Sequence, residues 1–268
     1  QAKTSTLPSS DSHSTPPLTR RSIPYLRIVT QSFKPSGMTA APELQLANLR
    51  ARIDSTDQAL SELLIARMGI IREVAALKAK HWPKSCHIRP GREGLMHAAI
   101  AERFAGSGFP PLAALSIWRQ LIGASTHLES PLTVGFLASY REHLWLAREY
   151  FGLEIGYQPA PDLETALAQA ASDTSNILLL PAHLEASWWK EAPRLHAMGL
   201  RIFAALPLVM ETLPQDTMPA LALAKLTPED SGDTISYHWR DGRVYASSGF
   251  FPEALGLFLG AHPRPISL

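Results

Sequence analysis

Apolar residues recur at helical spacing from Leu44 to Lys80, and this pattern predicts one long helix. The stretch contains no proline and a single glycine, Gly69. At about 1.5 Å per residue it would extend roughly 55 Å, which is more than a compact bundle of one chain can cover. A stripe of that length is typical of a helix that packs against a second chain. Its apolar positions are Leu46, Leu49, Ile53, Leu60, Leu63, Leu64, Ile70, Ile71, Val74 and Leu77.

Two shorter helices are expected after this one. The first begins at Pro90, a favourable first-turn residue, and runs to about Ala105. The run GSGFPP then breaks the chain. The second helix runs from about Pro111 to Leu128, and its core face comprises Leu115, Trp118, Leu121 and Ile122.

The pattern changes at Leu132, where strand-like and helix-like segments begin to alternate. This alternation predicts an α/β layer domain with a largely parallel sheet. We expect further strands over 219–226 and in a hairpin over 234–247 that turns at Asp-Gly, and a short final helix over 251–260. The alternating strands are expected over 132–138, 153–158, 176–182 and 200–209, and the helices over 140–151, 162–172 and 184–198.

Composition narrows the class of protein. The 268 residues are 46% hydrophobic and carry 25 basic and 24 acidic side chains, so the chain has no cationic surplus for binding nucleic acid. No apolar run reaches the 18 to 20 residues of a membrane span, and none is expected. Cys86 is the only cysteine, which favours a reducing compartment such as the cytoplasm. Cys86 and His87 are too few ligands for zinc, and we expect neither a metal nor a cofactor.

The first 37 residues differ from the rest. They are rich in Ser, Thr and Pro with one acid, Asp11, and we expect them to be disordered. Met38 stands just before the first predicted helix and is a candidate natural start. The predicted organisation is a disordered extension over 1–37, a helical domain over 38–130 and an α/β domain over 131–268.

The spacing of three cations along the predicted long helix indicates which of them share a face. Arg67 and Lys78 are eleven residues apart and fall within about 20° of one another around the helix axis. Arg50 lies seventeen residues before Arg67, about 100° away from that stripe. One straight helix therefore cannot easily direct all three into one pocket, although Arg50 can reach the pocket of a second subunit.

Further polar residues complete a recognisable pattern. The sequence reads LR-x-x-ID-x-x-D at 49–57, then Arg67 and Lys78, then Arg-Glu at 92–93, and S-x-x-x-E at 125–129. In order, spacing and residue type this resembles the all-helical chorismate mutase family over residues 44–129. Members of that family are intertwined dimers of one long and two shorter helices, so the resemblance implies a homodimer through the long helix.

The resemblance also implies a role for each cation. Arg67 and Arg92 are similar to the arginines that bind the two carboxylates of chorismate. Lys78 is similar to the lysine at the ether oxygen of the substrate. Arg50 resembles the arginine that reaches the neighbouring subunit's site.

The remaining pocket positions are filled by an acid and an S-x-x-x-E pair. Glu93 is similar to the acid that holds the ring hydroxyl, and Ser125 and Glu129 match the last two positions. The implied catalytic set is thus Arg67, Lys78 and Glu129, and the implied substrate-binding set is Arg50, Arg92, Glu93 and Ser125. Arg89 stands where many members have an acidic or neutral residue, and it has no assigned role.

Physical chemistry agrees with these residue types. Conversion of chorismate to prephenate needs neither covalent catalysis nor proton transfer, so the enzyme has to hold one conformer and stabilise charge on the ether oxygen. Arginine binds carboxylates in a bidentate manner. Glu129 can donate a hydrogen bond to the ether oxygen only when protonated, so we expect activity to fall as pH rises and Glu129→Gln to flatten that profile.

The second half weakly resembles the first lobe of prephenate dehydratase, a domain often fused to such a mutase. The likeness lies in VGFLASY near 134–140, Phe151-Gly152 and ILLLP at 177–181. The Thr-Arg-Phe motif of the dehydratase site is absent from the sequence, so dehydratase activity is not expected. The fusion favours phenylalanine and tyrosine biosynthesis. Two alternatives stay open, which are an isochorismate pyruvate lyase on the same fold and a non-catalytic sensor of an aromatic metabolite.

Overall fold

The computed structural model describes residues 41–82, 87–212, 219–253 and 256–268. The expected disorder over 1–37 and Cys86 lie outside these residues. Contacts divide the chain into two units, Gln1–Thr56 and Asp57–Leu268, with the boundary inside the first helix. The domain boundary expected at residue 130 stays a prediction. No helix among the described residues is both long and apolar enough to cross a membrane.

The three predicted helices of the first half are present. They are α1 (Pro42–His81), α2 (Pro90–Phe104) and α3 (Pro111–Glu129). Proline in the first turn starts both α2 and α3, because the first N–H groups of a helix have no intrahelical partner to lose. None of the described α1 side chains is buried, and within the second unit its exposed apolar residues are Leu60, Leu63, Leu64, Ile65, Ile70 and Leu77.

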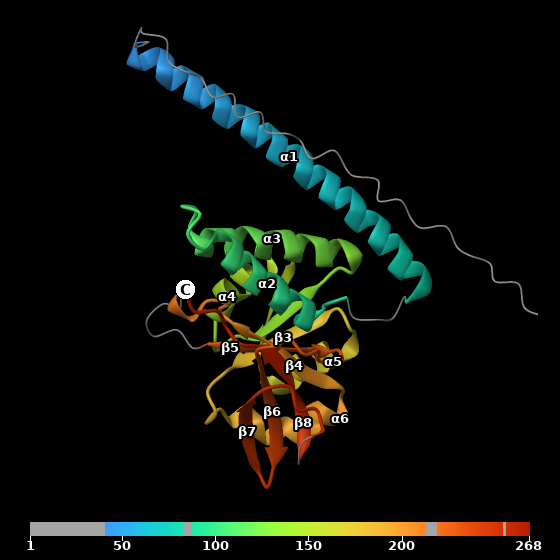
Figure 1. Cartoon of the computed structure of the whole chain (residues 1–268). Helices are drawn as coiled ribbons and strands as arrows, with labels where there is room; N and C mark the ends of the chain where they lie inside the picture. The colour runs from blue at the N-terminus through green and yellow to red at the C-terminus, as the bar shows by residue number, and fades with distance from the viewer. Residues whose placement is uncertain (1–40, 83–86, 213–218, 254–255) are drawn as a thin grey trace, which may run out of the picture. The chain divides into compact units, whose positions relative to one another are not determined.

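The second half contains an eight-stranded sheet with helices packed on it (Figure 1). The strand order is β2-β1-β3-β5-β4-β8-β6-β7. The strands are β1 (Thr133–Leu137), β2 (Gly156–Ala160), β3 (Asn176–Pro181), β4 (Leu200–Leu206), β5 (Ala220–Lys225), β6 (Thr234–Arg240), β7 (Arg243–Ser248) and β8 (Leu257–Pro263). The helices are α4 (His143–Phe151), α5 (Leu163–Ser172) and α6 (Ala192–Ala197), with 3-10 turns at Ser187–Glu191 and Met210–Thr212.

The sheet is mixed, so the expectation of a largely parallel sheet was wrong. β1 is parallel to β2 and β3, and β4 is parallel to β8, whereas β5 is antiparallel to β3 and β4, and β6 is antiparallel to β7 and β8. Parallel neighbours need a long crossover, usually a helix. Between β4 and β5 the described residues contain only one 3-10 turn, so the chain returns antiparallel.

Two predicted helices are also corrected. In place of a helix over 251–260, the chain forms β8, and Gly260 approaches the backbone of Ile202 so closely that a Cβ would lie 2.3 Å from the Ile202 carbonyl oxygen. Glycine with positive φ (127°) permits that approach but does not favour a helix. The helix expected over 184–198 is two pieces, because Pro193 starts a new helix after the 3-10 turn.

Each face of the sheet has its own core, and β3 shows why. Ile177 and Leu179 belong to the cluster that includes α4, whereas Leu178 and Leu180 belong to the cluster that includes α5 and α6. Successive side chains of a strand point to opposite faces, so this buried strand contributes to both clusters. The layered α/β arrangement is therefore confirmed, with a mixed sheet.

Close backbone approaches attach α2 and α3 to the sheet-containing half (Figure 1). A Cβ on Gly123 of α3 would lie 1.9 Å from the carbonyl oxygen of Phe151 at the end of α4. On α2, a Cβ on Gly91 would lie 2.5 Å from the carbonyl oxygen of Asp230. These contacts have no room for any side chain, and they hold α2 and α3 against the sheet-containing half.

Candidate active site

Arg67 of α1 binds Ser125 of α3. The Arg67 Nη1 donates to Ser125 Oγ at 2.7 Å and approaches the Leu121 carbonyl oxygen at 3.4 Å. Ser125 is buried and donates in turn to the Leu121 carbonyl at 2.6 Å. Burial lowers the pKa of Arg67, but an arginine remains a cation at neutral pH. Arg67 is thus a half-buried cation with a fixed direction.

Lys78 of α1 forms an ion pair with Glu129 of α3. The Lys78 side chain is 27% exposed and that of Glu129 only 9%. His87 lies beside this pair, with its Nδ1 3.7 Å from Glu129 Oε2. In the sequence, His87 stands out only as one of two side chains that are too few for a zinc site, and no local pattern indicates its position beside Glu129.

The two contacts converge on one end of α3. Arg67 and Lys78 are eleven residues apart, a rise of about 16 Å, whereas Ser125 and Glu129 are one turn apart, a rise of about 6 Å. The long cationic side chains therefore lean toward each other. The resemblance implied one pocket for all seven site residues, and four of them contact one another here, with two cations beside a hydroxyl and a carboxyl group.

The other three predicted site residues lie outside these contacts. Arg92 is exposed in the first turn of α2 and makes no side-chain hydrogen bond or ion pair with the described residues. Arg50 is exposed on α1 within the first unit. Glu93 forms an ion pair with Arg119, which is not among the predicted site residues. The roles of all three stay predictions.

Arg119 is a buried arginine at the centre of a polar network. Its side chain is 4% exposed, and its Nη1 is 2.7 Å from Glu93 Oε2 and 3.3 Å from His97 Nε2. Its Nε donates to the Tyr150 carbonyl oxygen at 2.7 Å, and its guanidinium lies over the Tyr150 ring at 3.7 Å. The network joins α2 and α3 to α4. The signal in the sequence is an arginine four residues after Leu115, on the apolar stripe of α3.

Burial also affects two histidines and gives a pH prediction. Burial, together with Arg119, lowers the pKa of His97 to about 3, and burial lowers that of His262 to about 4. The unfolded chain binds protons on these groups near pH 6.5, so it gains protons relative to the folded chain as pH falls below that value. We expect the free energy of unfolding to fall by about 2 kcal/mol for each histidine between pH 7 and pH 5.

Urea unfolding at pH 7 and pH 5 measures this difference. His97→Gln keeps an acceptor for Arg119 and should remove about half of the pH-dependent loss. His81→Gln, at an exposed position at the end of α1, should leave the loss unchanged. Equal stability of the wild type at both pH values would contradict the assignment.

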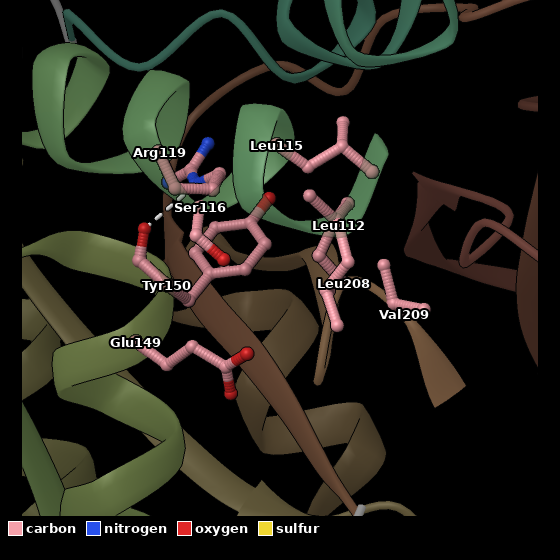
Figure 2. Close-up of a pocket in the computed structure, with 8 residues that line it drawn as sticks. All are labelled: Leu112, Leu115, Ser116, Arg119, Glu149, Tyr150, Leu208 and Val209. Carbon is pink, nitrogen blue, oxygen red and sulfur yellow. Dashed lines mark hydrogen bonds between the residues drawn. The ribbon is translucent and has the colours of Figure 1, made fainter. Parts of the chain in front are cut away.

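A small cavity beneath α3 is shown in Figure 2. Its volume of about 10 Å³ has room for about one water molecule and none for a metabolite. Glu149 Oε2 is buried there without a hydrogen-bond partner among the described residues, and burial raises the pKa of Glu149. This cavity is therefore not a substrate pocket. Its lining residues are Leu112, Leu115, Ser116, Arg119, Glu149, Tyr150, Leu208 and Val209.

Comparisons with known proteins agree with the helical pattern. Residues 49–130 match the family model of chorismate mutase type II. The bifunctional chorismate mutase/prephenate dehydratase of Stutzerimonas stutzeri is 28% identical over 144 residues, which cover 51% of this chain. The match spans 38% of that relative's length.

A solved structure, that of the quorum quenching acylase GqqA, aligns with 50% of this chain and 96% of its own at 11% identity. Its TM-score of 0.33 is too low to show a shared fold. The family match rests instead on the helical region, which contains most of α1 together with α2, α3 and the Arg67–Ser125 and Lys78–Glu129 contacts. Residues 49–130 are thus the part of the chain that is similar to chorismate mutase type II.

Proposed function

We propose that this protein is a chorismate mutase that converts chorismate to prephenate. The observation that carries the proposal is the convergence of Arg67 and Lys78 on Ser125 and Glu129 within the family domain. The relative that pairs a mutase with a dehydratase supports a place in the synthesis of phenylalanine and tyrosine. The cytoplasmic location expected from the single cysteine stays a prediction.

The proposed site acts by orientation and electrostatics. Arg67 binds one carboxylate of chorismate, and Arg92 binds the other after its exposed side chain turns inward. Lys78 and protonated Glu129 donate to the ether oxygen, where negative charge grows as the C–O bond breaks. Ser125 holds the direction of Arg67. Glu93 accepts a hydrogen bond from the ring hydroxyl.

Turnover by this route requires the Lys78–Glu129 ion pair to open, because both groups have to face the ligand. A dianionic substrate favours this opening, because its negative charges attract Lys78 and repel an ionised Glu129, which is protonated when it faces the ligand. Without ligand, Lys78 and Glu129 therefore bind each other, and ligand binding separates them.

A direct test is the loss of chorismate absorbance with purified protein, followed by identification of the product. Prephenate as the sole product supports the proposal. Pyruvate released from isochorismate, with no prephenate from chorismate, would establish the lyase instead. Binding of an aromatic metabolite without turnover would establish the sensor.

The dimer is part of the same proposal. The exposed apolar side chains of α1 favour a second copy of this chain as the partner, because none of the described α1 residues is buried. The angle of Arg50 on the helix favours its action in the partner's site. Light scattering at micromolar concentration is expected to show a dimer.

Mixing inactive subunits tests the role of Arg50. Arg50→Ala and Lys78→Ala homodimers should each be inactive, whereas a mixed dimer contains one site with both residues intact. Refolding the two together should restore up to about a quarter of wild-type activity, because half of the dimers are mixed and each has one good site. Mixed dimers that form and remain inactive would show that Arg50 does not act in the partner's site.

A further inference from the structure

The Nδ1 atom of His87 is buried and has no hydrogen-bond partner among the described residues. His87 lies just before the start of α2, and its side chain is 6% exposed. Its Nδ1 makes no hydrogen bond with the described residues, and the nearest carboxyl oxygen, Glu129 Oε2, is 3.7 Å away. That distance exceeds the range of a hydrogen bond by about 0.5 Å.

An orphaned buried donor or acceptor has an energetic cost. Leaving such a group unpaired destabilises a protein by about 1–3 kcal/mol, and native structures contain few of them. The proposed site has to rearrange when ligand binds. An unpaired buried atom at such a site indicates that it gains a hydrogen-bond partner in the ligand-bound state. The group that changes partner beside His87 is Glu129.

The proposed reaction, on which this inference rests, supplies that other state. When Lys78 moves onto the ether oxygen, Glu129 loses its ion-pair partner while its side chain is only 9% exposed. Removing one partner of a buried pair typically costs about 3–5 kcal/mol when nothing replaces it. A second hydrogen-bond donor beside Glu129 reduces that cost.

We propose that His87 is the positioning residue for Glu129 in the ligand-bound state. Its Nδ1–H donates to one carboxyl oxygen of Glu129 after a shift of about 0.8 Å. The other oxygen, which carries the proton, then faces the ether oxygen of the substrate. Glu129, a carboxylate in the ion pair, takes up one proton from solvent as the ligand binds and Lys78 leaves it, and His87 neither gains nor loses a proton. His87 exchanges with Lys78 as the partner of Glu129.

The charges around His87 suit this role. The groups that face it are Lys78 on α1 and Glu129 on α3. Burial and then Lys78 lower the pKa of His87 from 6.5, whereas Glu129 opposes the shift. The ring is therefore neutral at pH 7. A neutral ring donates one hydrogen bond without adding a positive charge, which would favour the ionised form of Glu129.

Asparagine and leucine at position 87 separate this role from packing. The amide of asparagine places an N–H near the position of Nδ1, whereas leucine has similar bulk and no donor. In the full-length chain, His87→Leu should lower kcat for chorismate about tenfold with KM within about twofold, and His87→Asn should stay within about threefold of wild type. His81→Leu, at an exposed position, is the matched control. If His87→Leu does not fold, His87→Gln replaces it with the same expectation, because its N–H lies near the position of Nε2.

A double-mutant cycle with Glu129→Ala completes the test. If His87 acts through Glu129, His87→Leu should cause no further loss in the Glu129→Ala background. The proposal is overturned if His87→Leu keeps full kcat, if His87→Asn is as slow as His87→Leu, or if the losses add. A wild-type protein that does not consume chorismate would overturn the proposed function and this inference with it, whereas an active wild type with unaffected variants overturns the inference alone.

Discussion

Replacing Lys78 by alanine is expected to lower kcat/KM for chorismate by about 10²–10³-fold. Removal of one preorganised donor at a developing oxyanion typically has an effect of this size. Lys78 is the α1 cation nearest to Glu129, and it is the group that the proposed reaction directs at the ether oxygen. Most of the loss should appear in kcat, because the charge on that oxygen grows only in the transition state.

Lys80→Ala provides the matched control for Lys78→Ala. Lys80 lies two residues further along α1, is exposed and makes no ion pair with the described residues. Its replacement should change kcat/KM by less than about twofold. Equal rates for Lys78→Ala and the wild type would exclude Lys78 from the reaction. The lysine that the resemblance places at the ether oxygen would then have no role in turnover.

Replacing Arg119 by methionine is expected to lower the free energy of unfolding by about 3–5 kcal/mol. The change leaves the Glu93 carboxylate, whose side chain is 12% exposed, without its cation. It also removes the hydrogen bond to the Tyr150 carbonyl oxygen that joins α3 to α4. Urea unfolding at pH 7 measures the difference.

Two further variants test whether the loss of stability in Arg119→Met comes from the unpaired charge of Glu93. Arg119→Met combined with Glu93→Gln should recover part of the loss, because no buried charge then remains unpaired. Arg103→Met, at an exposed position of α2, should unfold at the same urea concentration as the wild type. An Arg119→Met protein as stable as the wild type would show that the network does not hold the helices to the sheet-containing half.

Local signals in the sequence predict most of the elements, whereas the arrangement of the sheet depends on contacts that are distant in sequence. The apolar spacing of α1 and the prolines that start α2 and α3 are local signals, and the hairpin turn at Asp241-Gly242 is another. The position of β5 between β3 and β4 depends on pairings across the sheet, which periodicity within one strand does not encode. β8 was missed because its apolar residues are compatible with a helix until Gly260 meets Ile202.

In the candidate site, too, some features follow from local sequence signals and others depend on contacts that are distant in sequence. The spacing of eleven residues along α1 predicts that Arg67 and Lys78 share a face, and the spacing of four residues along α3 predicts the same of Ser125 and Glu129. That these two faces contact each other was implied only by the resemblance to the chorismate mutase family. The position of His87 depends on how the chain re-enters α2, and that of Arg119 on the packing of α3 against α4. Neither arrangement repeats with a helical period, so neither was found from the sequence.

Whether Arg67 and Lys78 catalyse the reaction is decided by kcat/KM for chorismate, measured for the wild type and for an Arg67→Ala/Lys78→Ala double variant. Both proteins are prepared identically, so a contaminating mutase would contribute equally to the two. We expect a wild-type kcat/KM of about 10⁴ M⁻¹s⁻¹ or more, with prephenate as the product, whereas the double variant should convert chorismate no faster than the reaction without enzyme. Equal rates for the two proteins would contradict the account.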